Sequence, residues 1–306
     1  MTSKRSTPRP GATGEARAVL TQVLQLLLNG AMAGTILAVP AIGLTVIFAV
    51  LRFPNFAVAS HATIGAFAGY VANVRFGLPV LPAIVVAFLV AGLVGLASDE
   101  LILKPFRAAG FITTAIGSIA LTIALENAVR FVFGNELRGY DLPLMRDWRF
   151  AGLRVGPQQV ENLAIALAVT AAIFAFLAFT RAGKAMRAVA DNPTLAGIKG
   201  VNGETIARTV SFVGMGLAGL GGMLLGLDTS IDPLTGFRAI LSIFAAAVVG
   251  GLGSVPGAVV GALVVGIGEE LSLLILSPNY RSAVGFLAIL LVLTVRPRGI
   301  LGQRAY

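Results

Sequence analysis

Long runs of apolar residues follow one another along this chain, from residue 19 to residue 295. A helix needs about 20 consecutive apolar residues to cross the hydrocarbon core of a bilayer, which is about 30 Å thick. Because only 12% of the 306 residues are charged and 57% are hydrophobic, one water-soluble core could not hide this apolar surface. The runs therefore predict an all-α, polytopic membrane helix bundle.

Eight of these runs are long and two are short. The long runs are 19–38, 56–73, 79–98, 110–133, 160–180, 206–227, 256–276 and 282–295. The short runs, 40–51 and 238–250, would cover only about 18–20 Å as helices. Since they lie next to Pro and Gly, we expect broken or re-entrant helices there. The bundle should then have eight to ten transmembrane or partly re-entrant helices.

Basic residues gather in four segments outside the runs, which is the bias of cytoplasmic loops. These segments are the tail 1–18, the loop with Lys104 and Arg107, the segment 181–205, and the C-terminal end with Arg296 and Arg298. The segments 134–159 and 228–236 are mixed or acidic and are expected outside. If both short runs cross the membrane, both termini lie in the cytoplasm. The net charge of +9 then reflects topology, and no nucleic-acid partner is expected.

The domain organisation that follows is simple. The polar tail 1–18 is expected to be a disordered basic extension, 19–302 one transmembrane domain, and 303–306 a cytoplasmic end. The chain has no Cys and one His, which excludes disulfides, thiolate sites and multi-histidine metal sites. It also lacks a phosphate-binding loop, a nucleophile elbow and a dinucleotide fingerprint. We therefore expect neither an enzyme nor a cofactor or metal.

Several polar residues lie inside the apolar runs. Gln22, Gln25 and Asn29 share one helix face, which fits hydrogen bonding between helices better than a pore lining, although both remain open. Glu126 and Arg130 are spaced for a local ion pair. His61 is interpreted as a packing residue and not as a proton relay, because a relay needs a chain of partners.

Small residues recur at a spacing of four in two of the runs. Such faces let helix backbones approach closely. The predicted packing glycines are Gly214, Gly222 and Gly226 in one run, with Ala218 between them, and Gly253, Gly257 and Gly261 in the other.

The segment 181–205 is too long and too patterned for a simple connection. Asn192 is a good N-cap, Pro193 suits the first helical position, and Gly200 can end a helix. They predict a short helix over 193–199. Its apolar residues Leu195, Ala196 and Ile198, beside Lys184 and Arg187, fit a docking site for a soluble partner or equally an interfacial helix on lipid headgroups.

The chain from about residue 26 to residue 302 resembles the LivH-type permeases of branched-chain amino-acid ABC transporters. The resemblance rests on RAGKAMRAVADNPTLAGIKGVN (181–202), AAAVVGGLGSVPGAVVGALVVGIGE (245–269), YRSAVGFLAILLVLTVRPRGILG (280–302), LNGAMAG (28–34), AIGLTVIF (41–48) and ELILKPFR (100–107). One departure concerns the family's N-F-A-H-G motif, where Val58 and Ala59 replace His and Gly. This departure leaves the cargo open between a branched-chain amino acid and a related amide or carboxylate.

The resemblance implies an importer permease in the bacterial inner membrane. Its partners would be a homologous second permease, two cytoplasmic ABC ATPase subunits, a periplasmic or lipid-anchored substrate-binding protein, and membrane lipid. The implied ATPase-coupling residues are Lys184, Arg187, Asp191, Asn192, Pro193, Leu195, Ala196, Ile198 and Gly200. The candidate pathway residues are Gln25, Asn29, Asn55 and Phe56. An ion-coupled secondary transporter or a channel is the alternative, for which Glu269 and Glu270 inside a run give modest support.

Overall fold

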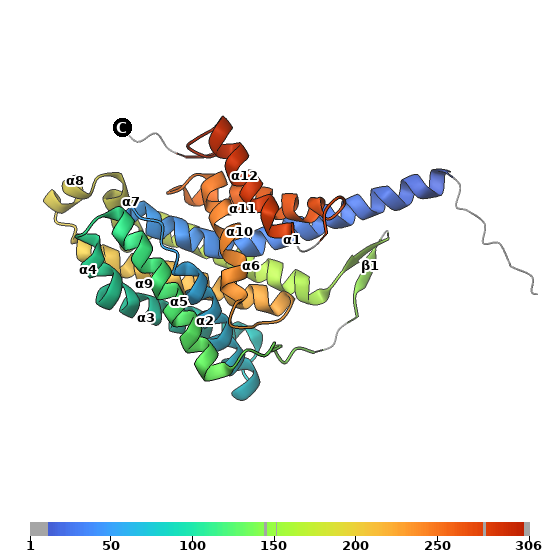
Figure 1. Cartoon of the computed structure of the whole chain (residues 1–306), viewed down its shortest axis with the longest axis horizontal. Coiled ribbons are helices and arrows are strands. Elements are labelled where there is room, and N and C mark those ends of the chain that lie inside the picture. Colours follow the sequence, from blue (N-terminus) through green and yellow to red (C-terminus); the bar gives the residue numbers. More distant parts are fainter. Residues whose placement is uncertain (1–11, 144–145, 151, 278–279, 303–306) are drawn as a thin grey trace, which may run out of the picture.

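Figure 1 shows the computed structural model, which describes residues 12–143, 146–150, 152–277 and 280–302. Apart from one short hairpin, its regular elements are helices, which confirms the predicted all-α class. The elements are α1 (Ala12–Leu51), α2 (Val58–Tyr70), the π-helical η1 (Val71–Arg75), α3 (Val80–Ser98), the π-helical η2 (Asp99–Leu103), α4 (Lys104–Arg107), α5 (Phe111–Phe133), β1 (Trp148–Phe150), β2 (Leu153–Val155), α6 (Pro157–Phe179), α7 (Arg181–Asp191), α8 (Pro193–Ile198), α9 (Gly203–Asp228), α10 (Thr235–Gly250), α11 (Val255–Ser272) and α12 (Arg281–Val295).

The lengths of these helices fit a multi-pass membrane protein. Six are long and apolar enough to cross a membrane by length and composition, namely Val19–Leu51, Val80–Arg107, Phe111–Phe133, Pro157–Phe179, Gly203–Asp228 and Val255–Ser272. The shorter apolar helices Thr235–Gly250 and Ala283–Val295 bring the number to eight among the described residues. This agrees with the predicted eight to ten helices.

The first helix differs from the prediction. α1 runs without interruption through Pro40, so the runs 19–38 and 40–51 form one helix and not two. Gly221 of α9 leaves room for the proline ring, because a Cβ there would lie 2.4 Å from Pro40 Cδ. Packing against α9 therefore accommodates a residue that the local sequence predicts to be a break. Residues 12–18 also belong to α1 and not to a disordered tail, whereas 1–11 and 303–306 lie outside the described residues.

The bundle has two ends, which we name by the elements found there. At the hairpin end, the Gln25 side chain of α1 pairs with the backbone of Arg154, with two hydrogen bonds of 2.8 Å. At the α8 end, Arg52, directly after α1, donates to the backbone carbonyl of Ala190 in α7. α1 therefore runs from the hairpin end to the α8 end, as Figure 1 also shows.

This direction bears on the predicted topology. The expectation that the N-terminal part and 181–205 share one side assumed that 19–38 and 40–51 cross separately, whereas they form one helix whose two ends lie at opposite ends of the bundle. α11 runs antiparallel to α1, since Gly30 packs on Ile267 and Gly34 on Leu263. The loop before α11 and the C-terminal segment packed on it therefore lie toward the α8 end. Which end faces the cytoplasm stays a prediction.

Glycines bring α9 into close contact with its neighbours in the core. A Cβ at Gly214 would lie 2.5 Å from Ile47 Cγ1, and one at Gly222 would lie 1.9 Å from the Ala62 carbonyl oxygen. At Gly226 a Cβ would lie 2.3 Å from Ile231 Cγ2. These approaches leave no space for a side chain, so backbone contact holds α9 against α1 and α2.

The second glycine series divides into two kinds. A Cβ at Gly257 would lie 2.4 Å from the Gly250 carbonyl oxygen, and one at Gly261 would lie 2.0 Å from the Ala246 carbonyl oxygen. Both glycines therefore let α11 approach α10. Gly253 differs from the prediction, because nothing lies within 4 Å of a Cβ there and its φ is +93°. Gly253 serves the turn between the helices and not their packing.

Candidate functional site

The segment after α6 folds into two short helices at the α8 end. Thr180 caps α7, because its Oγ1 accepts a 3.0 Å hydrogen bond from the Gly183 amide. The side chain of Asn192 caps α8 by accepting a 2.9 Å hydrogen bond from the Leu195 amide, and Pro193 occupies the first helical position. Gly200 has a φ of +86° and follows the helix. The short helix predicted over 193–199 is thus present as α8.

The apolar residues of α8 divide between surface and core. The side chains of Leu195 and Ile198 are 54% and 77% exposed. Ala196 is 5% exposed, so it packs inward and does not share the exposure that the sequence suggested. Two large apolar side chains therefore remain on the open surface of a six-residue helix.

The charged residues of α7 lie beside this surface. Lys184 and Asp191 are exposed. Arg187 is also exposed, and its Nη2 donates a 3.4 Å hydrogen bond to the Ala178 carbonyl at the end of α6. Met186 and Val189, on the opposite face of α7, are buried. α7 is thus an amphipathic helix, with its charged residues on the surface and its apolar face in the core.

Arg52 is a further residue at this end, and the sequence analysis did not single it out. It follows α1 with a φ of 60°, a conformation that residues other than glycine adopt infrequently. Its guanidinium donates to the Ala190 carbonyl, which ties the end of α1 to α7. A single arginine directly after a long apolar run could have indicated a residue that anchors the helix end. The sequence could not indicate that its partner is the Ala190 carbonyl.

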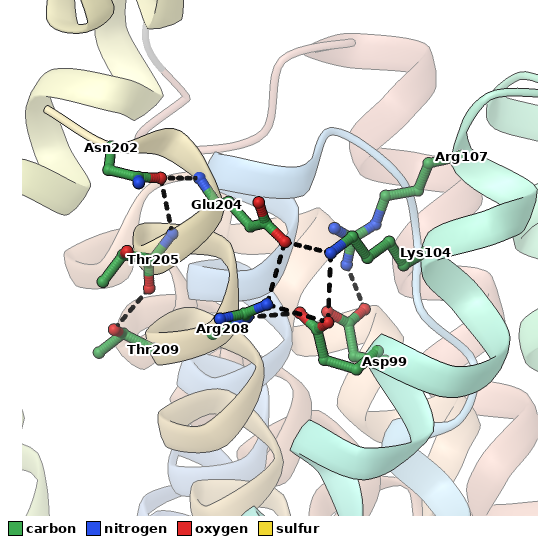
Figure 2. Close-up of polar contacts among 9 residues, drawn as sticks. Asp99, Lys104, Arg107, Asn202, Glu204, Thr205, Arg208 and Thr209 are labelled. Atoms are coloured by element: carbon green, nitrogen blue, oxygen red, sulfur yellow. Dashed lines mark hydrogen bonds and ion pairs between the residues drawn. The ribbon is translucent and has the colours of Figure 1, made fainter.

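A network of ion pairs joins the segment after α8 to the end of α3 (Figure 2). Lys104 of α4 pairs with Glu204 in the first turn of α9 and, at 3.2 Å, with Glu100 of η2. Arg208 of α9 pairs with Glu100 at 2.8 Å and with Glu204 at 3.0 Å. Four alternating charges from η2, α4 and α9 therefore neutralise one another at this corner.

Two flanking contacts hold the network in place, as Figure 2 shows. The side chain of Asn202 caps α9 by accepting from the amides of Glu204, at 2.9 Å, and Thr205, at 3.2 Å. Arg107 pairs with Asp99, whose side chain is buried. The i, i+4 spacing of Glu100 with Lys104 and of Glu204 with Arg208 could have indicated two local pairs. It could not indicate that the two pairs meet.

The candidate pathway residues fall into two separate places. Gln25 and Asn29 of α1 line a cavity of about 860 Å³ at the hairpin end, together with Asp147, Arg154 and other residues of that end. Gln25 Nε2 also donates to Asn29 Oδ1 at 2.9 Å. Gln22, which the sequence placed on the same face, lines this cavity too.

Asn55 and Phe56 lie in the break between α1 and α2. Asn55 is buried and its Oδ1 accepts a 3.0 Å hydrogen bond from the Ala57 amide, so its side chain shapes the start of α2. The Phe56 amide donates to Ser118 Oγ of α5 at 3.0 Å. Its ring stacks on Phe244 of α10 with centroids 4.6 Å apart. Phe56 therefore connects α5 and α10.

The remaining polar residues of the spans are engaged locally. Arg130 Nη2 lies 3.3 Å from Glu126 Oε1, as the i, i+4 spacing predicted. His61 is fully buried, and its Nδ1 lies 2.6 Å from the Ala57 carbonyl oxygen. Glu269 accepts a 2.6 Å hydrogen bond from Ser242 Oγ, which joins α11 to α10. The last contact ties this acid into the packing of α11 on α10.

Comparisons with known proteins place the chain among transport proteins. The sequence profile of the family described as branched-chain amino acid transport system / permease component matches residues 26–293. The high-affinity branched-chain amino acid transport system permease protein LivH of Escherichia coli (strain K12) is 30% identical over 296 residues, which cover 92% of this chain and 96% of the relative. The high-affinity branched-chain amino acid transport system permease protein BraD of Pseudomonas aeruginosa is 29% identical over 294 residues, which cover 92% of this chain and 96% of the relative.

Two further comparisons agree. The probable branched-chain amino acid transport permease protein LivH of Methanocaldococcus jannaschii is 30% identical over 305 residues, covering 91% of this chain and 92% of the relative. Among solved structures, PsaBC from Streptococcus pneumoniae in complex with Fab superposes with a TM-score of 0.50 at 14% identity. That match covers 93% of this chain and 96% of the other, and it concerns the fold alone.

Proposed function

Because this chain belongs to the family described as branched-chain amino acid transport system / permease component, we propose that it is the transmembrane subunit of an ABC importer. It moves a branched-chain amino acid, or a related small amide or carboxylate, across the inner membrane. Partner subunits hydrolyse the ATP, since the chain carries no phosphate-binding loop. The family match favours this function over the ion-coupled alternative.

The proposed assembly has three kinds of partner besides lipid, which covers the exposed apolar faces. A homologous permease pairs with this chain in the membrane, and two ATPases bind at the α8 end. A periplasmic or lipid-anchored binding protein delivers the solute at the hairpin end. ATP binding then changes the relative stability of inward-open and outward-open states, because the ATPases contact those states differently.

The observation that carries the ATPase assignment is the exposure of Leu195 and Ile198 on a capped helix at one end of the bundle. Two apolar anchors of this size suit a groove on a protein partner. Lys184 and Arg187 lie on the preceding helix, where they can steer association. An interfacial helix on lipid would use the same exposed Leu195 and Ile198, and the family match favours the ATPase as the partner.

The experiment replaces Leu195 with Asp in the whole transporter. Loss of a buried apolar anchor weakens an interface by about 2 kcal/mol or more, which is about 30-fold in affinity. The Leu195→Asp protein should insert and pair with the second permease but release the ATPases. ATP-dependent uptake of leucine into proteoliposomes should then be lost, and ATPase co-purification should fall.

Thr194→Asp is the matched control. It adds the same charge one residue earlier on an exposed position of α8, without removing an apolar anchor. An acid in the first turn also suits the helix dipole. Uptake by the Thr194→Asp protein should stay near the wild-type rate. Normal ATPase retention and uptake by the Leu195→Asp protein would exclude α8 as the coupling helix.

A further inference from the structure

Two ion pairs lie close together on one side of the bundle. In α5, Arg130 pairs with Glu126 at 3.3 Å. At the start of α10, Arg238 pairs with Asp232 at 2.5 Å. Asp232 lies close enough to Glu126 for the two carboxylates to interact electrostatically. The four charges therefore form one cluster contributed by α5 and by the segment that begins α10.

Glu126 and the start of α10 lie within the bundle, whereas Arg130 is three positions before the end of α5. Glu126 precedes the last residue of α5 by seven positions, which is about 10 Å along a helix. α10 also begins within the bundle, because the Gly236 amide donates to Thr63 Oγ1 of α2 at 3.0 Å. Thr63 lies seven residues before the end of α2, or about 10 Å, and η1 extends the helix further. Ionised groups at such depth usually face a protein interior or a water-filled space.

The two signs of charge are not exposed equally. The side chains of Arg130 and Arg238 are 34% and 57% exposed, whereas those of Glu126 and Asp232 are 10% and 14% exposed. Asp232 is also held beneath the surface, since its Oδ1 accepts from the Leu234 amide and from Thr235 Oγ1, both at 3.1 Å. The carboxylates thus neutralise the arginines from the buried side, and the guanidinium groups face the surface of the bundle. Hydrocarbon would not solvate them.

The same side of the bundle contains the break between α1 and α2. Phe56 bonds to α5 through Ser118 and stacks on Phe244 of α10. Phe244 lies six residues beyond Arg238 on α10, toward the α8 end. An arginine pair and a stacked phenylalanine pair therefore follow one another along the span.

We propose that the face formed by α5 and α10 lines a water-filled solute pathway, in which Arg130 and Arg238 receive the carboxylate of the solute. This rests on the proposed function, in which a homologous permease lies opposite. Exposed guanidinium groups disfavour direct packing against an apolar surface of that partner, because burying them unpaired is costly. The gap would suit an anion, because guanidinium groups bind carboxylates through paired donors.

The test uses single cysteines, since the chain has none. Ile123→Cys places a thiol on the stripe of α5 that holds Glu126 and Arg130, at spacings of three and seven. Ala124→Cys is the control, because it is exposed at the same depth but turned by about 100° around the helix. Each variant is expressed with its partner subunits and treated in membranes with impermeant thiol reagents. One reagent carries a sulfonate and the other a trimethylammonium group.

The thiol at position 123 should react and the thiol at 124 should stay protected by lipid. Relative to a free thiol, position 123 should favour the anionic reagent. Arg238→Gln should lower that preference about two- to fivefold, and Arg238→Lys should keep it. If Arg238→Gln fails to assemble because Asp232 loses its partner, Asp232→Asn with Arg238→Gln removes both charges and should also lower the preference.

Protection at 123 equal to that at 124 would mean that lipid or the second permease covers this face, and would overturn the proposal. A charge preference that survives both neutralising variants would overturn the role of Arg238. Neither readout requires uptake or ATP hydrolysis. The Leu195→Asp experiment can therefore fail while this one succeeds, and the reverse also holds.

Discussion

Nε of Arg208 in α9 lies 2.8 Å from Oε1 of Glu100 in η2, although 108 residues separate the two in sequence. Glu100 belongs to the segment that ends α3, and Arg208 lies in the second turn of the helix that follows α8. We expect a displacement of α8 to reach α3 through this pair, together with Lys104 and Glu204.

A double-mutant cycle on Glu100 and Arg208 should show this link. Each single change to Gln should lower the free energy of unfolding, and the double change should cost less than the sum of the two single changes, because each removes the same ion pair. ATP-dependent uptake should fall in both single variants while the ATPases stay bound. Arg75→Gln combined with Glu100→Gln is the control and should be additive, since Arg75 lies at the other end of the bundle. Additivity for Glu100 and Arg208 would contradict the link.

The cap of α8 should matter because a helix of six residues has little stability of its own. Asn192→Ala removes the acceptor for the Leu195 amide and should destabilise the helix by about 1 kcal/mol. Leucine uptake should fall without loss of folded protein. Asn192→Asp keeps an accepting oxygen and should restore uptake, whereas equal defects in both variants would show that the amide itself is needed.

Three glycines should respond differently to alanine, according to their surroundings. Gly222→Ala should lower the free energy of unfolding by about 1–3 kcal/mol, because its Cβ would lie 1.9 Å from the Ala62 carbonyl oxygen. Gly253→Ala should cost about 1 kcal/mol through its positive φ alone. Gly197→Ala meets nothing within 4 Å and should not lower stability. Melting temperatures of the purified variants would reveal this order, and a wild-type value for Gly222→Ala would refute the close contact.

The direction of α1 predicts which positions share a side of the membrane. Thiols introduced at Gln22 and Arg149 should both react from the hairpin side, and thiols at Lys184 and Thr194 only from the opposite side. Labelling of intact cells with an impermeant thiol reagent, followed by labelling of opened membranes, distinguishes the sides. Reaction of positions 22 and 194 from the same side would show that α1 does not cross.

The hairpin end illustrates how a single side chain can be hidden in a loop that the sequence places outside. Tyr140 donates from its hydroxyl to the Ala66 carbonyl at 2.8 Å, and burial raises the pKa of this phenol. It also packs against Gly226 of α9. The polar composition of 134–159 predicts an external segment, but it does not indicate which of its residues anchor it.

The sequence by itself determined the helical class, most helix boundaries and α8, because these depend on local signals. Apolar length sets the spans, and Asn192, Pro193 and Gly200 set the short helix through caps and backbone preference. The family resemblance likewise lies in contiguous motifs, and the profile match over residues 26–293 confirmed it.

Only the tertiary structure decided the course of α1, the role of each glycine and the meeting of distant charges. Pro40 breaks a helix in isolation, but Gly221 of another helix makes room for its ring. Gly253 and Gly257 read alike in sequence, yet only one has a backbone opposite it. Arg208 finds Glu100, and Asp232 approaches Glu126, because helices far apart in the chain pack side by side. Contacts of this kind depend on which helix faces pack together in the interior. That packing depends on all the helices of the bundle and not on any local segment.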